Sequence, residues 1–178
     1  MRRVLIFVFV FLLAGSAAAG GGAPLRCTIE GTHGPDVLSG TPGNDVICDL
    51  GGSDVVYGGA GNDIVLDGAG RDVVYGEEGD DRVYVRAGEN VVHGGEGEDE
   101  LNASAARPAT NVLEGGAGND GIYGGRGRDV IRGGSGQDLL VGGAGDDVID
   151  ARDTERDVVR GGNGRDTVRS DTLDDVRS

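Results

Sequence analysis

Aliphatic residues recur at every ninth position through most of the chain. From Gly31 onward the sequence divides into consecutive nonapeptides, such as GTPGNDVIC at 40–48 and GGAGNDIVL at 58–66. Eight units pass without insertion up to residue 102, residues 103–114 interrupt the count, and the register returns over 115–169 with one extra residue within 151–160. Short apolar runs between glycine-rich segments predict strands of about three residues joined by tight turns.

The aliphatic eighth position predicts a narrow core. One nonapeptide cannot bury its single apolar side chain alone, so units of this kind are stable only when they stack on one another. The eighth residues are Leu38, Ile47, Val56, Val65, Val74, Val83, Val92, Leu101, Leu113, Ile122, Ile131, Leu140, Ile149, Val159 and Val168.

The sixth position of the units is acidic almost throughout. Asn90 and Asn111 replace the acid in the two weakest units, and Asp157 holds the same position in the irregular unit near the end. The fourth position is glycine in most units, which predicts a turn with positive φ there. Apart from Asp157, the aspartates at this position are Asp36, Asp45, Asp54, Asp63, Asp72, Asp81, Asp99, Asp120, Asp129, Asp138, Asp147 and Asp166.

Composition leaves two classes of protein open. The chain has 178 residues, 37 of them glycine, with 4% aromatic residues and no tryptophan, so it lacks the side chains of a conventional globular core. A disordered Gly/Asp-rich chain and a repeat protein with a thin core both remain. A disordered linker has no reason to hold an aliphatic residue every ninth position, so the repeat protein is favoured. The net charge of −15 argues against nucleic acid and anionic lipid as partners.

The repeated pattern G-G-x-G-x-D-x-U-x, with U aliphatic, resembles the RTX (repeats-in-toxin) calcium-binding β-roll. The resemblance covers roughly residues 31–169, and residues 27–48 also look like the start of small secreted calcium-binding proteins of this family. It implies an all-β, right-handed parallel β-roll with two nonapeptides, or 18 residues, per coil. It also implies Ca²⁺, as several ions, as the cofactor.

In that family the first six residues of each unit form a turn and the last three form a strand. Aspartates 18 residues apart would then stack about one strand spacing apart and repel one another. Calcium relieves this repulsion because it accepts six to eight hard oxygen ligands in flexible geometry. The resemblance therefore implies that the twelve sixth-position aspartates from Asp36 to Asp147 and Asp166, as given above without Asp157, bind the metal. We expect the best sites around residues 31–81 and 115–150, and weak or absent calcium between them, where Val85, Arg86, Asn90, Pro108 and Asn111 depart from the pattern.

The N-terminus carries an export signal. Arg2 and Arg3 precede ten apolar residues, 4–13, and Ala17 to Ala19 offer a cleavage site before Gly20. We therefore expect a secreted, extracellular protein, with an uncleaved anchor as the minor alternative. A Sec-type leader departs from RTX toxins, which use a C-terminal signal, and that argues against the toxin interpretation. The expected organisation is a signal peptide (1–19), an N-terminal edge (20–30), a first β-roll block (31–102), an irregular break (103–114), a second block (115–169) and a C-terminal cap (170–178).

Cysteine usage agrees with export. Cys27 and Cys48 are the only cysteines, and an even pair in an exported chain predicts a disulfide. No catalytic site is expected. The GAGNDG at 116–121 matches a dinucleotide fingerprint only because it lies in the repeat, and neither His33 nor His93 has a nucleophile placed near it by the register.

One outward-facing row suggests a partner. Val55, Tyr57, Val73 and Tyr75 recur at 18-residue spacing on the outer face of the predicted strands. Strand propensity alone explains such residues; the alternative is a docking face for a cell-surface glycan, a protein or a second copy. The expected function is that of a secreted calcium-binding structural or surface-interaction module whose folding depends on Ca²⁺, and not of an enzyme. The alternative is an accessory β-roll module of a secreted RTX enzyme or toxin system, such as a hydrolase or epimerase.

Overall fold

The computed structural model describes residues 25–104 and 108–177. The predicted signal peptide, at 1–19, lies outside the described residues. No helix in the described ranges is long and apolar enough to cross a membrane. The strands in chain order are β1 Ile29–Glu30, β2 Val37–Ser39, β3 Val46–Cys48, β4 Val55–Ala60, β5 Ile64–Leu66, β6 Val73–Glu78, β7 Arg82–Tyr84, β8 Val91–Glu96, β9 Glu100–Asn102, β10 Val112–Ala117, β11 Gly121–Arg126, β12 Val130–Ser135, β13 Leu139–Ala144, β14 Val148–Ala151, β15 Val158–Asn163, β16 Thr167–Ser170 and β17 Asp175–Arg177.

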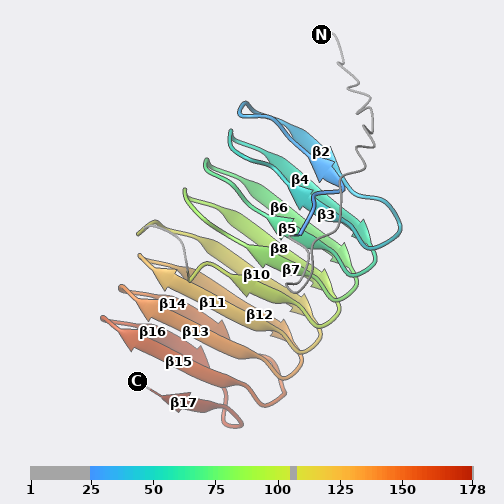
Figure 1. Cartoon of the computed structure of the whole chain (residues 1–178). Coiled ribbons are helices and arrows are strands. Elements are labelled where there is room, and N and C mark those ends of the chain that lie inside the picture. Colours follow the sequence, from blue (N-terminus) through green and yellow to red (C-terminus); the bar gives the residue numbers. More distant parts are fainter. Residues whose placement is uncertain (1–24, 105–107, 178) are drawn as a thin grey trace, which may run out of the picture.

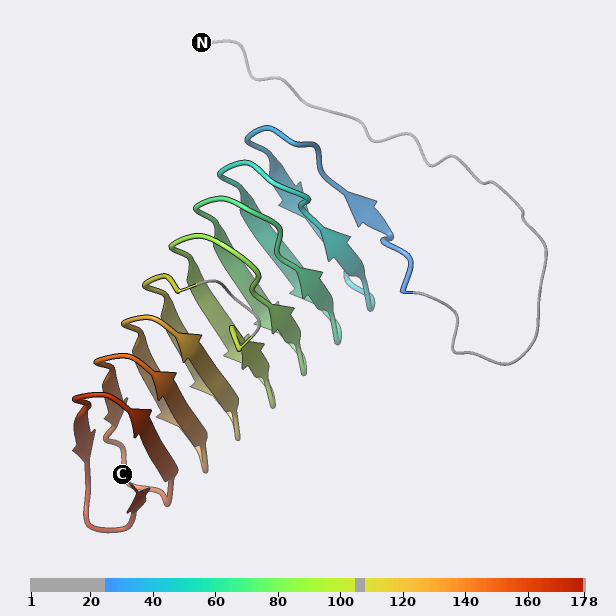
Figure 2. The same cartoon turned by 60° about the vertical axis from the view of Figure 1, so that its left-hand side comes forward.

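The strands form two parallel sheets whose members alternate along the chain. The odd-numbered strands β1 to β17 make a nine-stranded sheet, and the even-numbered strands β2 to β16 make an eight-stranded sheet. Figure 1 and Figure 2 show successive coils stacked along one axis, with the two sheets facing each other across a thin interior. In the first block Val56 pairs with Val74 and Val65 with Val83, so each coil contains 18 residues. The all-β parallel β-roll predicted from the sequence is confirmed.

The core consists of the eighth residue of each unit. These side chains are 0% exposed from Ile47 through Val159, and Leu38 at the first coil is 7% exposed. Val168, near the C-terminal end of the stack, is only partly buried because fewer neighbours cover it. The predicted single-file core is therefore confirmed along the stack, and it weakens only at the ends.

The turn glycines allow the coils to approach closely. At the fourth position Gly118 has a φ of 134°, and a Cβ there would collide with the carbonyl oxygen of Gly97 in the preceding coil. Second-position glycines such as Gly116, with a φ of 123°, share the positive φ, which the sequence argument did not predict. Gly34 and Gly43 of the first coil and Gly70 are not in this region, so the prediction of positive φ at the fourth position holds for most units and not for all.

The irregular break does not interrupt the stack. β8 pairs with β10, and Val92 lies beside Leu113, so this coil has 21 residues where its neighbours have 18. The strands on both sides of the break therefore belong to the same two sheets. One continuous β-roll contains both blocks that the sequence suggested.

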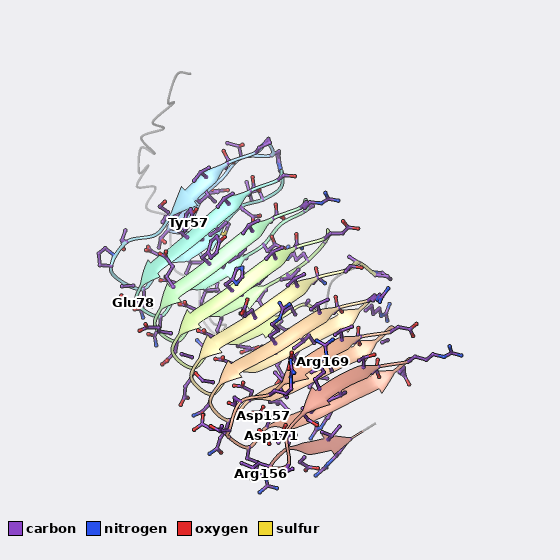
Figure 3. All side chains as sticks on the ribbon, turned by 180° about the vertical axis from the view of Figure 1, so that it is seen from behind. Tyr57, Glu78, Arg156, Asp157, Arg169 and Asp171 are labelled. Carbon is purple, nitrogen blue, oxygen red and sulfur yellow. A yellow bond between two sulfur atoms is a disulfide. The ribbon has the colours of Figure 1, made fainter. Side chains whose placement is uncertain are left out.

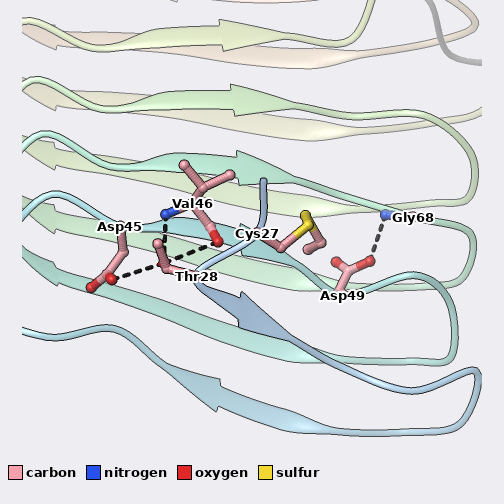
Figure 4. The surroundings of a disulfide bond; sticks show 7 residues. Cys27, Thr28, Asp45, Val46, Asp49 and Gly68 are labelled. Carbon is pink, nitrogen blue, oxygen red and sulfur yellow. Dashed lines mark hydrogen bonds between the residues drawn. A yellow bond between two sulfur atoms is a disulfide. The ribbon is translucent and has the colours of Figure 1, made fainter. Parts of the chain in front are cut away.

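The N-terminal edge is tied to the first complete coil by the disulfide Cys27–Cys48, as predicted. Cys48 ends β3, and β1 lies beside β3 with Ile29 opposite Ile47. In Figure 4 the Thr28–Asp45 hydrogen bond lies at the start of β3, and the disulfide and Asp49 lie at its end. The bond holds the first strand of the nine-stranded sheet in register.

Candidate metal centre

The sixth-position residues form two columns, one at each edge of the roll. We call the first column the residues that precede the even-numbered strands and the second column those that precede the odd-numbered strands. The first column is Asp36, Asp54, Asp72, Asn90, Asn111, Asp129, Asp147 and Asp166, and the second is Asp45, Asp63, Asp81, Asp99, Asp120, Asp138, Asp157 and Asp174.

Within each column, every residue is hydrogen-bonded to the next one along the stack. The backbone N–H of Asp45 donates to Oδ1 of Asp63 at 2.7 Å, and that of Asp63 donates to Oδ1 of Asp81 at 2.8 Å. The same bond crosses the irregular break, where the N–H of Asp99 donates to Oδ1 of Asp120 at 2.9 Å. From Asp54 and Asp63 onward, one side-chain oxygen of each residue in the columns is thus used to hold the preceding coil.

The second carboxylate oxygen is buried and has no hydrogen-bond partner. A buried carboxylate oxygen without a partner is costly, and native structures keep few of them. Among the described residues the unpartnered Oδ2 atoms of the two columns belong to Asp54, Asp63, Asp72, Asp81, Asp99, Asp120, Asp129, Asp138, Asp147 and Asp157. These side chains are at most 3% exposed. A regular series of unsatisfied oxygens indicates that a cation or protons must occupy these positions in the stable folded state.

Burial raises the pKa of nine of these carboxyl groups, those of Asp54, Asp63, Asp81, Asp99, Asp120, Asp129, Asp138, Asp147 and Asp157. Desolvation is the main cause, and neighbouring carboxylates add to it. The pKa of Asp81 and of Asp120 rises to about 7, and that of Asp99 and of Asp129 to about 6. The charged columns are therefore unstable by themselves at neutral pH.

Where the first position of a unit is glycine, it leaves room at a place where oxygens converge. A Cβ built on Gly58 would lie 2.8 Å from Oδ2 of Asp63 and 2.5 Å from the carbonyl oxygen of Gly76 in the next coil. At Gly124 the corresponding distances are 2.9 Å to Oδ2 of Asp129 and 2.7 Å to the carbonyl oxygen of Gly142. A carboxylate oxygen and a backbone carbonyl oxygen thus border the same space, and both are ligand types that calcium accepts.

The first coil departs from this arrangement. The hydroxyl and the N–H of Thr41 donate to Oδ2 of Asp45 at 2.8 and 2.7 Å, and Thr32 makes the same pair of bonds to Asp36. Burial raises the pKa of Asp45, but the hydrogen bonds from Thr41 and Thr28 outweigh it and lower that pKa overall. The threonines occupy oxygens that remain free in later coils, so Asp36 and Asp45 are the least suited of the predicted ligands.

The centre of the first column is neutral. Asn90 and Asn111 keep the hydrogen-bonded ladder, because the N–H of Asp72 donates to Oδ1 of Asn90 at 2.9 Å and that of Asn90 donates to Oδ1 of Asn111 at 3.3 Å. Val85 fills the interior at this level and is 1% exposed. The amides thus preserve the hydrogen-bonded ladder without the charge, and weak or absent calcium there stays a prediction.

Four acidic residues that the prediction of ligands omitted lie in or beside the columns. Asp157 and Asp174 continue the second column, since the N–H of Asp138 donates to Oδ1 of Asp157 at 2.9 Å and that of Asp157 to Oδ1 of Asp174 at 3.1 Å. The sequence places Asp157 at the sixth position of its irregular unit, whereas Asp174 lies in the C-terminal tail, where the repeat is no longer visible. Asp49 and Asp67 are 0% exposed at the first position of their units. The replacement of glycine by aspartate twice at 18-residue spacing was a visible signal for them.

The predicted outward row forms a stacked ladder on the eight-stranded sheet. The rings of Tyr57 and Tyr75 stack with centroids 5.2 Å apart, and Tyr75 stacks on His93 at 5.0 Å. Nδ1 of His93 lies 3.1 Å from a carboxylate oxygen of Glu114 on the next strand. Tyr57 projects from the outer face in Figure 3 and is 37% exposed. The ring faces lie against one another, so the row presents mainly ring edges to solvent.

The fold and the columns define a class of protein, the parallel β-roll whose coils are joined through stacked aspartates. The model of the RTX calcium-binding nonapeptide repeat matches eight overlapping segments that together cover residues 30–105 and 109–176. The chain therefore belongs to the RTX calcium-binding repeat family. No curated protein matches it in sequence.

Proposed function

We propose that this protein is a secreted structural module that binds several calcium ions and folds only when they are bound. The observation that carries the proposal is the series of buried, unpartnered Oδ2 atoms along both columns. Repeats of this family bind calcium, and the oxygens of this chain fit that ion. The ligands would be Asp54, Asp63, Asp72, Asp81, Asp99, Asp120, Asp129, Asp138, Asp147 and Asp157, together with carbonyl oxygens of the turns.

Calcium fits better than magnesium for a geometric reason. The first-position glycines open each space toward backbone carbonyls as well as a carboxylate, which supports a high number of oxygen ligands. Calcium accepts six to eight such ligands, whereas magnesium requires a tight octahedron and gives up water reluctantly. When bound, the ion would neutralise the carboxylates and join consecutive coils.

Folding and binding should then be one event. Without cations the stacked carboxylates and the net charge of −15 favour an expanded chain, and the core is one side chain wide. Binding free energy becomes folding free energy when the site exists only in the folded state.

Secretion is supported by two features of different kinds. The first is the leader-like sequence at 1–19, and the second is the disulfide Cys27–Cys48, a bond that persists mainly in oxidising compartments. Expression in a Gram-positive host, followed by N-terminal sequencing of the protein in the medium, should show a chain that begins at Gly20. Retention of the chain in the cells with its leader intact would contradict secretion.

The folding experiment is a calcium titration of the chain from Gly20 onward at pH 8. Circular dichroism in chelator should show a coil, and millimolar calcium should produce a β spectrum with a smaller hydrodynamic radius. Magnesium at the same concentration is the control and should leave most of the chain unfolded. A β spectrum that persists in chelator would refute calcium-dependent folding.

The role beyond calcium binding stays a prediction. Val55, Tyr57, Val73 and Tyr75 form the surface at which a glycan, a protein or a second copy would bind, and the calcium-loaded roll would assemble it. The alternative role as an accessory module of a secreted enzyme also stays a prediction.

A further inference from the structure

Beside the first column lies a cluster of three buried carboxylates that the repeat pattern does not require. Asp49, Asp67 and Asp72 are each 0% exposed, and each offers one carboxylate oxygen within 4.8 Å of those of the other two. Asp72 is a sixth-position residue, but Asp49 and Asp67 stand at the first position, where glycine is usual. The cluster therefore differs from the sites between the glycine turns.

Each of the three carboxylates uses one oxygen to hold the backbone or an amide. Oδ1 of Asp49 accepts from the N–H of Gly68 at 2.6 Å, a bond drawn in Figure 4. Oδ1 of Asp72 accepts from the N–H of Asp54 at 2.8 Å, and Oδ2 of Asp67 accepts from the amide of Asn90 at 3.3 Å. Each of the three carboxylates is thus held in place through only one of its two oxygens.

The other oxygen of each carboxylate has no partner. These atoms are Oδ2 of Asp49, Oδ1 of Asp67 and Oδ2 of Asp72, and all three are buried. No arginine or histidine of the described residues forms an ion pair with any member of the cluster. Arg71, the nearest basic residue in sequence, pairs with the exposed Glu89 instead. Three carboxylates without a cation cannot all stay charged in such a place.

Aspartate at the first position also changes what occupies the space inside the turn. A Cβ on glycine at this position would fill the space bordered by the carboxylate and the carbonyl oxygen of the next coil, as at Gly58. In the units of Asp49 and Asp67 that space receives a side-chain carboxylate. Val85 occupies the first position one coil after Asp67 and is equally buried, so an apolar side chain fits the corresponding space there. Aspartate is therefore not needed there to fill volume.

We propose that Asp49, Asp67 and Asp72 form a discrete calcium site in which first-position side chains replace turn carbonyls as ligands. Its oxygens are three carboxylates, so it carries more negative charge than a site that combines one or two aspartates with neutral carbonyls. More carboxylate ligands raise the affinity for calcium. The site lies beside the disulfide-tied first coils, and it should fill first and start the stacking of the roll from that end.

The decisive variant is the double substitution Asp49→Asn/Asp67→Asn, which keeps size and removes two charges. Calorimetry and native mass spectrometry with Ca²⁺ should find one ion fewer per chain. The tightest class of sites should be lost, so that the affinity for the first ion bound falls at least tenfold. The matched control is Glu77→Gln/Glu78→Gln, which removes the same charge from exposed residues of β6 and should leave the number of ions unchanged.

A second variant separates calcium from shared protons. Asp67→Val copies the residue that occupies the next coil, and it should lose the same ion while the calcium-free chain becomes easier to fold. An unchanged number of ions in both Asp49→Asn/Asp67→Asn and Asp67→Val would overturn the proposal and indicate that the carboxyls are held by protons. Failure of the unaltered chain to bind any calcium would instead refute the proposed function, so the two failures are distinguishable.

Discussion

The backbone N–H of Asp120 donates a hydrogen bond of 2.9 Å to Oδ1 of Asp138, one coil further along the stack. The carboxylate that serves as a candidate metal ligand is therefore also part of the scaffold. Oδ1 of Asp138 holds the preceding coil, and Oδ2 of Asp138 is buried without a partner. Removing the charge and removing the hydrogen bond are separate perturbations in this protein.

The two roles can be separated at Asp63. Asp63→Asn keeps an oxygen for the N–H of Asp45, as Asn90 does naturally for Asp72, and it removes only the charge. We expect it to lower the number of bound calcium ions with a small change in the maximal β signal. Asp63→Ala also leaves the N–H of Asp45 unpaired, which should cost a further 1–3 kcal/mol or so of the free energy of unfolding. Calorimetry and denaturant unfolding at saturating calcium measure both quantities.

Asn90→Ala is the comparison for these variants. Because Asn90 carries no charge, its loss removes no charged ligand and should leave the number of calcium ions unchanged, while the bond from the N–H of Asp72 and the bond to Oδ2 of Asp67 disappear. Equal losses of calcium from Asp63→Asn and Asn90→Ala would show that the assignment of ligands is wrong.

Acid should partly replace calcium. The pKa values of Asp81 and Asp120 are raised to about 7 and those of Asp99 and Asp129 to about 6, so the folded state binds protons more tightly than the unfolded chain does. This contribution to stability is fully present below the ordinary aspartate pKa near 4 and disappears as the pH rises through 6 to 7. Calcium-free protein should therefore show more β structure at pH 5 than at pH 8. Circular dichroism of dialysed protein measures this difference.

Calcium affinity should have the opposite pH dependence, because protons compete for the same oxygens. The apparent affinity should rise from pH 5 to pH 8. A calcium-free chain equally unfolded at both pH values would contradict the assignment of raised pKa values to the columns.

The disulfide should stabilise the N-terminal coils. Cys27 and Cys48 are 21 residues apart, and closing a loop of this size contributes about 3 kcal/mol in the entropic model. Cys27→Ser/Cys48→Ser should lower the free energy of unfolding of the calcium-loaded protein by up to about that amount. Hydrogen exchange should show faster exchange in β1 to β3 and little change beyond β10, whereas uniform loss of protection would contradict a local role.

The aromatic ladder distinguishes strand stacking from docking. Tyr57→Ser/Tyr75→Ser should cost about 1–3 kcal/mol of stability, since two stacked pairs are lost. The number of calcium ions should be unchanged because both side chains lie on the outer face. If the row is a docking face, calcium-dependent self-association in analytical ultracentrifugation or binding to cell-wall glycans should also weaken. Binding that is indifferent to the substitutions would leave stacking as the whole role of the row.

The sequence by itself determined the repeat, and the repeat determined the fold. A nine-residue period with one aliphatic residue per unit can bury that residue only by stacking, so the core column from Ile47 to Val159 followed from spacing. The division of the aspartates into two series followed from the 18-residue coil that the resemblance to the RTX β-roll implied. The disulfide followed from two cysteines in an exported chain. Local chemistry was sufficient because each coil contacts only its neighbours.

Only the tertiary structure decided how the acidic residues differ from one another. Whether an oxygen is free depends on what the neighbouring coil places beside it: threonine occupies it at Asp45, and nothing does at Asp63. Spacing did not show that the 21-residue coil keeps both columns continuous, nor that Asp49 and Asp67 point inward beside Asp72. These relations join residues from different coils, and burial and partner atoms arise only when the coils are stacked.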